Sequence, residues 1–444
     1  MGAHAAFLQW REVPFARRAQ RMREAAQILR TRRAEYARTM TTEMWKPIVQ
    51  AEAEVDKCAW VCEYYADHAE AFLAEQPRET PASRSYVRFD PLGPVLAVMP
   101  WNFPFWQVFR FAAPALMAGN AGILKHASNV PRSALAMEEV FREAGFPRGL
   151  FSTVLVGPSA VAGLIADPRI VAVTLTGSEL AGSKVAEQAG YALKKTVLEL
   201  GGSGPFIVLA DADIGAAART AADARLINSG QSCIAAKRFI VGEPVADQLL
   251  ERYLHELSSR RMGDPLARET QVGPQARVDL GDSLHQQIAE SVKRGAKLLL
   301  GGEVPARKGA FYPPTLLAAV DKGMPAFDGD LRACRRRHPR QGRGRCRSPR
   351  QRLGLWSRRL ALYAGSRARR AHGGADRGRR GVRKQPRDVG PASALRRDQA
   401  LGLRAGALVV RHPRVRQHQV GLDRVVTTWT AGARAREEPH RDLL

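Results

Sequence analysis

Between residues 95 and 200, short apolar runs alternate with segments of helical periodicity, and this alternation restricts the fold more than any other feature of the sequence. The apolar runs do not alternate strictly with polar residues, which is typical of parallel strands buried on both faces. They are VLAVM, GILK, FSTVLV, VAVTLT and KTVLEL, at residues 95–99, 122–125, 151–156, 171–176 and 195–200. The pattern predicts an α/β fold, with a doubly wound parallel sheet of the dinucleotide-binding type in residues 1–200.

Two amphipathic helices are predicted before this sheet, at residues 16–40 and 50–73, because apolar residues recur there at intervals of three and four. Cys58 and Cys62 lie one helical turn apart in the second helix. A zinc site would need a second pair of Cys or His residues with suitable spacing, and none accompanies them. We therefore expect both thiols to be apolar members of a helix face, and we predict no metal site.

A second α/β unit follows Gly202. Strands are predicted at residues 205–210 and 237–242, helices at 212–227 and 245–257, a further helix and strand within 284–300, and a turn with a hairpin at 301–320. We interpret residues 201–327 as a partial catalytic domain packed beside the first sheet.

The net charge of the chain is concentrated after residue 326. Residues 327–444 contain 30 Arg, one Lys and nine acidic residues, which supply +22 of the formal net charge of +26. Three explanations of residues 328–444 compete: a disordered basic arm for nucleic acid or acidic partners, an added domain, or a GC-rich coding sequence read in a shifted frame. We favour the shifted frame, because hydrophobic periodicity stops abruptly, and we expect no nucleic-acid partner.

The remaining composition indicates a cytoplasmic protein without a membrane segment. No apolar run approaches the ~18 residues that a membrane-spanning helix needs. The five cysteines have no regular spacing and no secretory leader precedes them, so a disulfide framework is not expected.

Four motifs fall at predicted strand ends or in loops, where α/β sheets place their functional sites. They occupy residues 99–104, 125–128, 176–182 and 198–202, and the segment Gly-Gln-Ser-Cys at 230–233 adds a fifth. Each motif taken alone is a weak signal. A reactive thiol needs access and a polar setting, which the small polar residues before Cys233 would provide. The five motifs in this order are highly specific.

Residues 15–327 resemble the aldehyde dehydrogenase superfamily. The segments GNAGILKHASNVP, TLTGSELAGSKVA, KKTVLELGGSGPFIVLADAD and NSGQSCIAAKR are most similar to its succinate-semialdehyde dehydrogenase branch. The resemblance implies that Cys233 is the nucleophile, Glu199 the general base and Asn102 an oxyanion donor. It also implies a nicotinamide-dinucleotide site formed by Trp101, Lys125, Ser128, Gly177, Ser178, Gly182 and Leu200.

The oxidation of an aldehyde by hydride transfer requires these residue types. A thiolate adds to the carbonyl, donors such as the Asn102 amide stabilise the oxyanion, and a general base then activates the water that cleaves the thioester. Glu199 lies between Leu198 and Leu200, so we expect a dry setting that raises the pKa of its carboxyl group. The competing interpretations are a core cysteine, a solvated carboxylate and an asparagine that forms a turn.

The cofactor is predicted to be NADP, with NAD also permitted. Enzymes of the superfamily that use NAD often have Glu three residues after the lysine at the strand end, and here that residue is Ser128. Lys125 and Ser128 together could accept a 2′-phosphate, whereas a carboxylate would repel it. The alternative is that Ser128 caps the following helix.

For the substrate, Arg110 lies eight residues after Asn102, where the succinate-semialdehyde branch has an arginine that binds the distal carboxylate. Arg110 could equally be a structural ion-pair partner. The branch often has a second arginine six residues before the cysteine, but this sequence has Ile227 there, with Arg225 two residues earlier.

The sequence also departs from the family at both ends. The family is homo-oligomeric, yet its N-terminal strands and C-terminal pairing strand are not recognisable here, and Gly329–Arg332 replaces the family's Glu-x-Phe-Gly-Pro. Two hypotheses follow: an active aldehyde dehydrogenase that uses a small acidic semialdehyde, or a catalytically impaired relic of one. A nucleic-acid-binding protein with a basic tail is the weakest third alternative.

Overall fold

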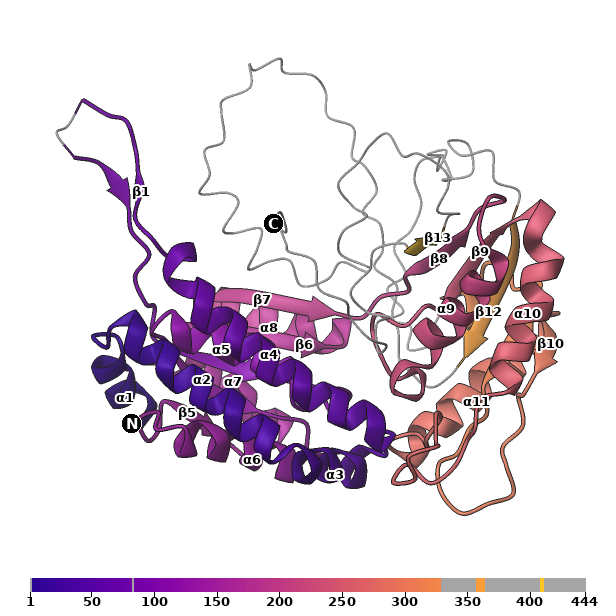
Figure 1. Ribbon diagram of the computed structural model, residues 1–444, viewed down its shortest axis with the longest axis horizontal. Helices are drawn as coiled ribbons and strands as arrows, with labels where there is room; N and C mark the ends of the chain where they lie inside the picture. The colour runs from indigo at the N-terminus through magenta and orange to yellow at the C-terminus, as the bar shows by residue number, and fades with distance from the viewer. Residues whose placement is uncertain (1, 82–83, 329–356, 364–407, 411–444) are drawn as a thin grey trace.

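The structure is a computed structural model that describes residues 2–81, 84–328, 357–363 and 408–410. Two sheets organise it, each with its own helices (Figure 1). A third, two-stranded sheet of β1 (Gln76–Pro77) and β2 (Tyr86–Val87) forms a hairpin that projects from the first part of the chain.

Four helices precede the first large sheet, where the sequence predicted two. They are α1 (Gly2–Trp10), α2 (Phe15–Thr31), α3 (Arg33–Met44) and α4 (Ile48–Phe72). The first predicted helix is interrupted at Arg32, whose φ of −101° and ψ of 22° lie outside the helical region. The Arg32 guanidinium contacts both Glu35 of α3 and Glu143, which ends α6 (Pro131–Glu143). Periodicity does not register such long-range contacts.

Helix α1 was not predicted, and burial against the first sheet explains why it forms. Ala6, Phe7 and Trp10 are buried, and the Trp10 indole N–H donates a hydrogen bond to the carbonyl of Leu116 at 2.8 Å. In helix α4, Cys58 and Cys62 are fully buried, as expected of apolar positions. No cluster that could hold a metal ion occurs in the part of the chain that the structure describes.

The first large sheet contains five parallel strands in the order β5-β4-β3-β6-β7. The strands are β3 (Pro94–Val98), β4 (Ala121–Lys125), β5 (Phe151–Thr153), β6 (Ala172–Gly177) and β7 (Lys195–Leu200). Starting from β3, the chain first adds β4 and β5 on one side and then β6 and β7 on the other side. The sheet is therefore doubly wound, as predicted. Its topological switch point lies at the carboxyl ends of β3 and β6.

Helices cover both faces of this sheet, which explains why its strands are apolar without alternation. On one face α5 (Trp106–Met117) and α6 (Pro131–Glu143) pack with the N-terminal helices around buried Phe109 and Leu124. On the other face α7 (Val161–Ala166) and α8 (Glu179–Tyr191) pack over Leu96 and Val173. A 3₁₀ turn, η1 (Pro158–Ala160), precedes α7.

The second sheet has the order β10-β11-β12-β9-β8-β13. Its strands up to residue 328 are β8 (Pro205–Val208), β9 (Arg238–Gly242), β10 (Lys297–Leu300) and β11 (Thr315–Ala318), and its helices are α9 (Ile214–Leu226), α10 (Ala246–Ser258), α11 (Val278–Lys293) and α12 (Pro325–Asp328). Strands β8 and β9 are parallel, and β10 and β11 form an antiparallel hairpin. Strand β10 is the strand predicted within 284–300, so the hairpin predicted at 301–320 lies partly outside that range and contributes only β11 to it. The predicted boundary after residue 200 falls in the loop between β7 and β8.

Two further strands come from the arginine-rich segment. Strand β12 (Ser357–Tyr363) pairs antiparallel with β9 and β11, and β13 (Leu408–Val410) pairs parallel with β8. The rest of the prediction for residues 328–444, including Gly329–Arg332, lies outside the described residues.

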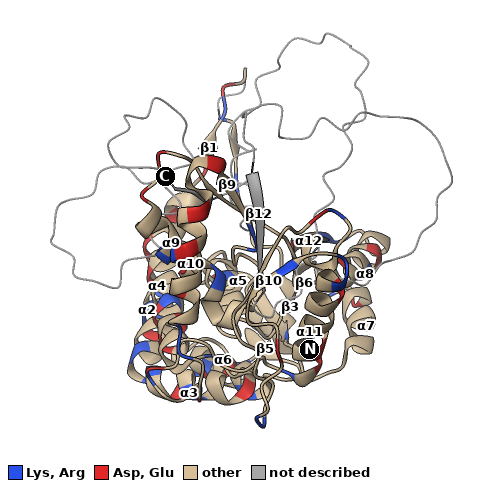
Figure 2. Cartoon of the chain, turned by 90° about the vertical axis from the view of Figure 1, so that its right-hand side faces the viewer, with Lys and Arg blue, Asp and Glu red and all other residues tan. Residues whose placement is uncertain are grey.

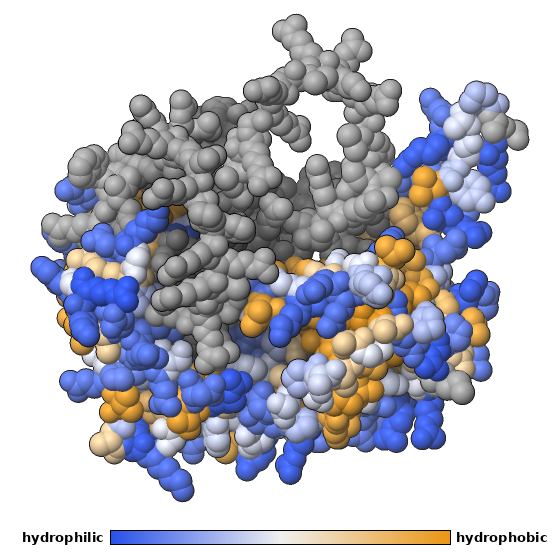
Figure 3. Space-filling view, turned by 180° about the vertical axis from the view of Figure 1, so that it is seen from behind, coloured by the Kyte–Doolittle hydropathy of each residue, from blue (hydrophilic) through white to orange (hydrophobic). Residues whose placement is uncertain are grey.

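The described surface carries charges of both signs. Lys and Arg are interspersed with Asp and Glu over helices such as α2, α3, α9 and α10 (Figure 2). Hydrophobic side chains form patches on the face seen from behind (Figure 3). Exposed large hydrophobic side chains of the described residues include Leu180 and Tyr191 of α8, Leu193 in the following turn, and Val197 of the edge strand β7. None of the helices within the described ranges could cross a membrane.

Candidate active site

The predicted motifs meet in one hollow between the two sheets. This hollow, of ≈ 210 Å³, lies at the carboxyl ends of β3, β6 and β7 and is closed on the far side by the start of α11. All three predicted catalytic residues line it: Asn102, Glu199 and Cys233. Four predicted cofactor residues line it as well, namely Trp101, Gly177, Ser178 and Leu200. The switch point of the doubly wound sheet therefore coincides with the predicted site.

The backbone before Cys233 makes an unusual turn. In η2 (Ile227–Gly230), Asn228 and Ser229 both have a φ of 53°, and Gly230 follows at 79°. Non-glycine residues in this left-handed region cost on the order of 1–3 kcal/mol each, so they persist only where the surroundings hold them. The turn presents Cys233, which is half-buried and accessible from the hollow.

Hydrogen bonds from α9 and from segments distant in sequence hold this turn. From the end of α9, the buried Arg225 guanidinium donates to the carbonyls of Gly230 at 2.7 Å and Ala236 at 3.1 Å. Arg225 is only 2% exposed, so it braces the loop and does not face the hollow. It therefore does not replace the arginine that the resemblance would place at Ile227.

Segments distant in sequence complete the support of the loop. The amide of Asn228 donates to the Gln50 side chain at 2.6 Å, the amide of Gly273 donates to the Ser229 hydroxyl at 2.8 Å, and the amide of Ala276 donates to the Gln231 side chain at 2.9 Å. Helix α4 and the segment before α11 thus fix the nucleophile loop.

Asn102 is coupled directly to that loop. Its Nδ2 donates to the carbonyl of Gln231 at 3.0 Å, while the Asn228 side chain donates to the Asn102 carbonyl at 2.7 Å. The bond to Gln231 uses one of the two N–H groups of the Asn102 side-chain amide. Because the amide group is planar, this bond also fixes the direction of the second N–H group. The asparagine links two motifs across the hollow, and its own Oδ1 accepts from the amide of Phe103, so the turn-forming interpretation holds as well.

A buried ion pair supports Asn102 from behind. Lys46 and Glu54 contact each other with side chains 0% and 2% exposed. Glu54 Oε1 also accepts from the amides of Phe105 at 3.0 Å and Trp106 at 2.9 Å, at the first turn of α5. The Lys46 ammonium lies 3.9 Å from the ring centroid of Phe103. The pair therefore fixes the path of the chain just after Asn102.

Glu199 lies at the end of β7 in a partly dry setting. Burial raises the pKa of its carboxyl group, and the nearby positive charge of Arg110 partly opposes that rise. This is the direction that the sequence predicted from Leu198 and Leu200. A raised pKa suits a general base that must take a proton from water near neutral pH.

The remaining predicted cofactor residues lie along the same sheet edge. Lys125 ends β4 and is 8% exposed, and burial lowers the pKa of its ammonium group. Ser128 is exposed in the next turn, and Val130 rather than Ser128 occupies the cap position of α6, so the capping alternative for Ser128 is wrong. Ser178 caps α8 by accepting from the amide of Ala181 at 3.3 Å.

Gly182 does not line the hollow but supports a residue that does. A Cβ atom at this position would lie 2.4 Å from a terminal methyl group of Leu200. Only glycine therefore allows α8 to approach Leu200 in its present position.

Helix α11 supplies lining residues that the sequence analysis missed. They are Leu280, Ser283, Leu284 and Gln287, with Arg277 just before the helix. Their helical periodicity was visible, but nothing in it indicated which face would close a site almost 50 residues from Cys233. Thr176 and Gln231 also line the hollow, and both were inside predicted motifs without an assigned role.

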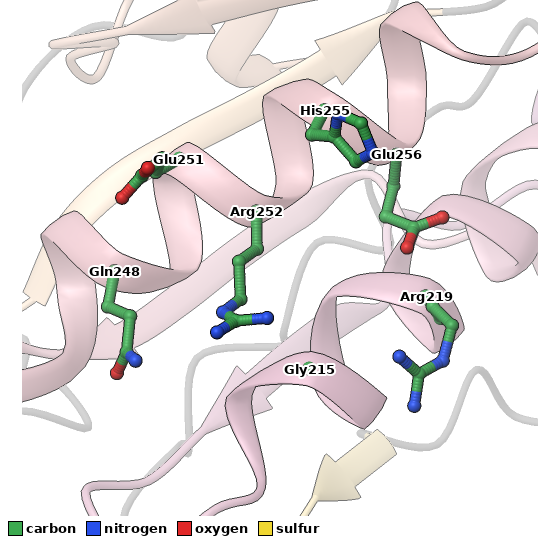
Figure 4. A pocket seen from close by; sticks show the side chains of 7 residues that line it. All are labelled: Gly215, Arg219, Gln248, Glu251, Arg252, His255 and Glu256. Atoms are coloured by element: carbon green, nitrogen blue, oxygen red, sulfur yellow. The ribbon is translucent and has the colours of Figure 1, made fainter.

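A second hollow, of ≈ 410 Å³, lies on the outside of the second unit between α9 and α10. Side chains of Arg219, Gln248, Glu251, Arg252, His255 and Glu256 surround it (Figure 4). These side chains are largely exposed and carry both charges, and no predicted site residue lies among them.

Comparisons with known proteins identify the family of the chain. The model of the aldehyde dehydrogenase family matches residues 1–331. A probable NADP-dependent succinate-semialdehyde dehydrogenase from Synechocystis is 53% identical over 325 residues, which is 73% of this chain and 72% of that protein. A succinate semialdehyde dehydrogenase, named as NAD(P)-dependent, from Escherichia coli is 47% identical over 74% of this chain and 71% of its own.

A solved structure shows the same relationship. The crystal structure of succinic semialdehyde dehydrogenase from Streptococcus pyogenes in complex with NADP+ has a TM-score of 0.72 and 39% identity, and covers 74% of this chain and 72% of that one. This chain belongs to the aldehyde dehydrogenase family. The resemblance inferred from the motifs is confirmed, and the match begins at residue 1 rather than residue 15.

Proposed function

We propose that this protein oxidises succinate semialdehyde to succinate, with NADP+ as the preferred oxidant and Cys233 as the nucleophile. The observation that carries the proposal is the presence of Cys233, Asn102 and Glu199 around one hollow at the switch point of the sheet. A thiol, an amide donor and a carboxylate with a raised pKa are the three groups that aldehyde oxidation through a thioester requires.

In the first half of the reaction, the Cys233 thiolate forms a C–S bond to the aldehyde carbon, and the carbonyl oxygen becomes an oxyanion. The second N–H of Asn102 and the backbone N–H of Cys233 stabilise that charge; losing one such donor typically costs ~3 kcal/mol of barrier. When bound, NADP+ would supply the oxidising power, as an acceptor for the hydride of the former aldehyde carbon. Cys233 then holds the acyl group as a thioester.

In the second half, Glu199 accepts a proton from a water molecule whose oxygen adds to the thioester carbon. The C–S bond breaks, succinate leaves, and Cys233 is restored as a thiolate. The raised pKa of Glu199 makes it a stronger base than an ordinary carboxylate, while Arg110 limits the rise and so keeps a fraction of Glu199 ionised.

The residues of the sheet edge fit a phosphorylated dinucleotide. Lys125 is a nearly buried cation that forms no ion pair with any described carboxylate, and the exposed Ser128 hydroxyl lies three residues further on. Together they offer a charge and a hydrogen bond to a 2′-phosphate. Gly177 and Ser178 place the start of α8 at the hollow, where its amide groups and dipole favour an anion. Relatives named as NADP-dependent support this preference.

The chemistry at Arg110 supports an acidic substrate. Among the described residues, Arg110 makes one hydrogen bond, to the Thr176 hydroxyl at 3.4 Å, and no ion pair with a carboxylate. This favours the substrate-binding interpretation over the structural ion pair. Thr176 lines the hollow, and a guanidinium beside it can bind a carboxylate through two parallel hydrogen bonds.

The proposal is tested by following NADPH formation with the purified full chain, succinate semialdehyde and NADP+. We expect turnover in the unchanged protein and none above background in Cys233→Ala. Absence of turnover in a folded protein that binds NADP+ would instead support the impaired relic. Equal turnover in Cys233→Ala would contradict the role of the thiol.

A further inference from the structure

His126 is a buried titratable residue at the catalytic edge of the first sheet, and the proposed mechanism does not use it. It directly follows Lys125, the last residue of β4, and is only 5% exposed. Burial lowers the pKa of its imidazole to about 4, and the charge of Lys125 acts in the same direction, while backbone groups of Pro104 and Met99 oppose the fall. The ring is therefore neutral near neutral pH, with one N–H donor and one acceptor nitrogen.

Two hydrogen bonds determine which ring nitrogen carries the proton. The amide of Ala127 donates to Nδ1 of His126 at 2.8 Å, so Nδ1 is the acceptor. The proton is then on Nε2, which lies 3.0 Å from the carbonyl oxygen of Pro104 and donates to it. Both ring nitrogens are thus satisfied, as a buried ring requires. The imidazole is held in one tautomer and forms a rigid connection between the end of β4 and Pro104.

The bond to Pro104 extends the contact between β3 and β4 beyond the sheet. Pairing of the two strands ends at Lys125, whose carbonyl also accepts from the amide of Met99 at 3.1 Å. Past that point the chain leaves the sheet, and His126 contacts it again at Pro104. The loop of residues 100–103 lies between these two contacts, so both of its ends are fixed to β4.

This loop contains Asn102, the proposed oxyanion donor, two residues before Pro104. The Asn102 side-chain amide donates to the carbonyl of Gln231 in the nucleophile loop at 3.0 Å. Pro104 is buried and has no amide N–H, and its carbonyl accepts no hydrogen bond from any described residue other than His126. The path of the chain just after Asn102 therefore depends on the His126 ring.

The direction of the Asn102 amide matters for the chemistry. One of its N–H groups is used by Gln231, so only the second can reach an oxyanion. Such a donor must be aimed at the place where the charge develops. The oxyanion exists only after the thiolate has added, so a misdirected donor slows the reaction without weakening substrate binding.

We propose that His126 is a positioning residue for the oxyanion donor: its Nε2–H holds Pro104 and thereby directs the second N–H of Asn102 toward the oxyanion formed at Cys233. This inference rests on the proposed function, because it assumes that Asn102 stabilises such an oxyanion. His126 is not among the residues that line the hollow, so it acts through Asn102 and not on the substrate.

Two substitutions separate the two hydrogen bonds of the ring. In His126→Asn, the side-chain oxygen can replace Nδ1 as the acceptor for Ala127, but the shorter side chain does not reach Pro104. In His126→Gln, the longer side chain places an N–H near the former Nε2, so the bond to Pro104 can be kept. We expect kcat to fall about ten-fold or more in His126→Asn, with the KM for the aldehyde within about two-fold. In His126→Gln, kcat should stay within about three-fold.

The measurement uses the purified full chain with succinate semialdehyde and with butanal, an aldehyde of the same chain length without the carboxylate. Both substrates form an oxyanion, so both should show the same fall in kcat. In Asn102→Ala, adding His126→Asn should lower kcat no further, because the donor that His126 positions is already absent. The exposed His68→Asn is the matched control and should leave kcat unchanged.

The outcomes separate this inference from the proposed function. If the unchanged protein does not prefer succinate semialdehyde to butanal, the proposed substrate is wrong, while the comparison of the His126 variants still decides the inference with butanal. If His126→Asn keeps kcat, or if its loss persists in Asn102→Ala, the role of His126 is overturned and the proposed function stands. An equal fall in His126→Asn and His126→Gln would also overturn it, because it would show a general structural effect.

Discussion

At the scale of single residues, the environment of Glu199 determines how the reaction depends on pH. Its folded pKa is raised by burial, and it acts as a base only when ionised. Turnover should therefore be lost as the pH falls through that raised pKa, at a higher pH than the ~4.3 of an ordinary glutamate would give.

The measurement is the pH profile of kcat with butanal, which does not need Arg110 for binding. Because Arg110 opposes the rise, Arg110→Met should move the acidic limb of the profile to still higher pH. An acidic limb at the ordinary glutamate pKa, unchanged in the variant, would show that Glu199 is not the base.

Gly182 and Gly190 form a matched pair on α8. A Cβ at Gly182 would meet Leu200 at 2.4 Å, whereas a Cβ at Gly190 would meet nothing within 4 Å. Gly182→Ala should displace Leu200 and raise the KM for NADP+ several-fold. Gly190→Ala, in the last turn of α8, should leave that KM unchanged. Equal KM values in both variants would show that Leu200 does not contribute to the cofactor site.

At the scale of elements, the Lys46–Glu54 pair connects α4 to the first turn of α5. Glu54→Gln leaves the fully buried Lys46 without its countercharge, and breaking such a pair costs about 3–5 kcal/mol. Urea unfolding should show this loss, and the double variant Lys46→Met with Glu54→Gln should recover part of it. A change below ~0.5 kcal/mol in Glu54→Gln would mean that the pair contributes little, as exposed pairs do.

Element-level patterns also show where prediction from sequence stops. The strands of the first sheet were predictable because each apolar run is buried on both faces. The break at Arg32 and the presence of α1 were not, since they depend on Glu143 and on the contacts of Trp10. The left-handed turn at Asn228 and Ser229 was equally hidden, because neither residue type requires a positive φ.

At the scale of the whole molecule, the order of the strands explains why the motifs meet. Parallel strands end at one sheet edge, so residues after β3, β6 and β7 were expected to converge there. The second unit brings Cys233 and α11 to that edge, and sequence patterns within it do not reveal how it docks. The proposed catalytic residues could therefore be named from motifs, whereas the supporting residues Gln50 and Glu54 required the structure.

The covalent state of Cys233 tests the central claim most directly. The variant Glu199→Gln, mixed with succinate semialdehyde and NADP+, should form about one NADPH per active protein molecule and then slow down on the order of 10²-fold or more, because the thioester is no longer hydrolysed efficiently. Mass spectrometry of the trapped protein should find one succinyl group, located on the peptide that contains Cys233. A full burst of NADPH with no acyl group on Cys233 would contradict the account.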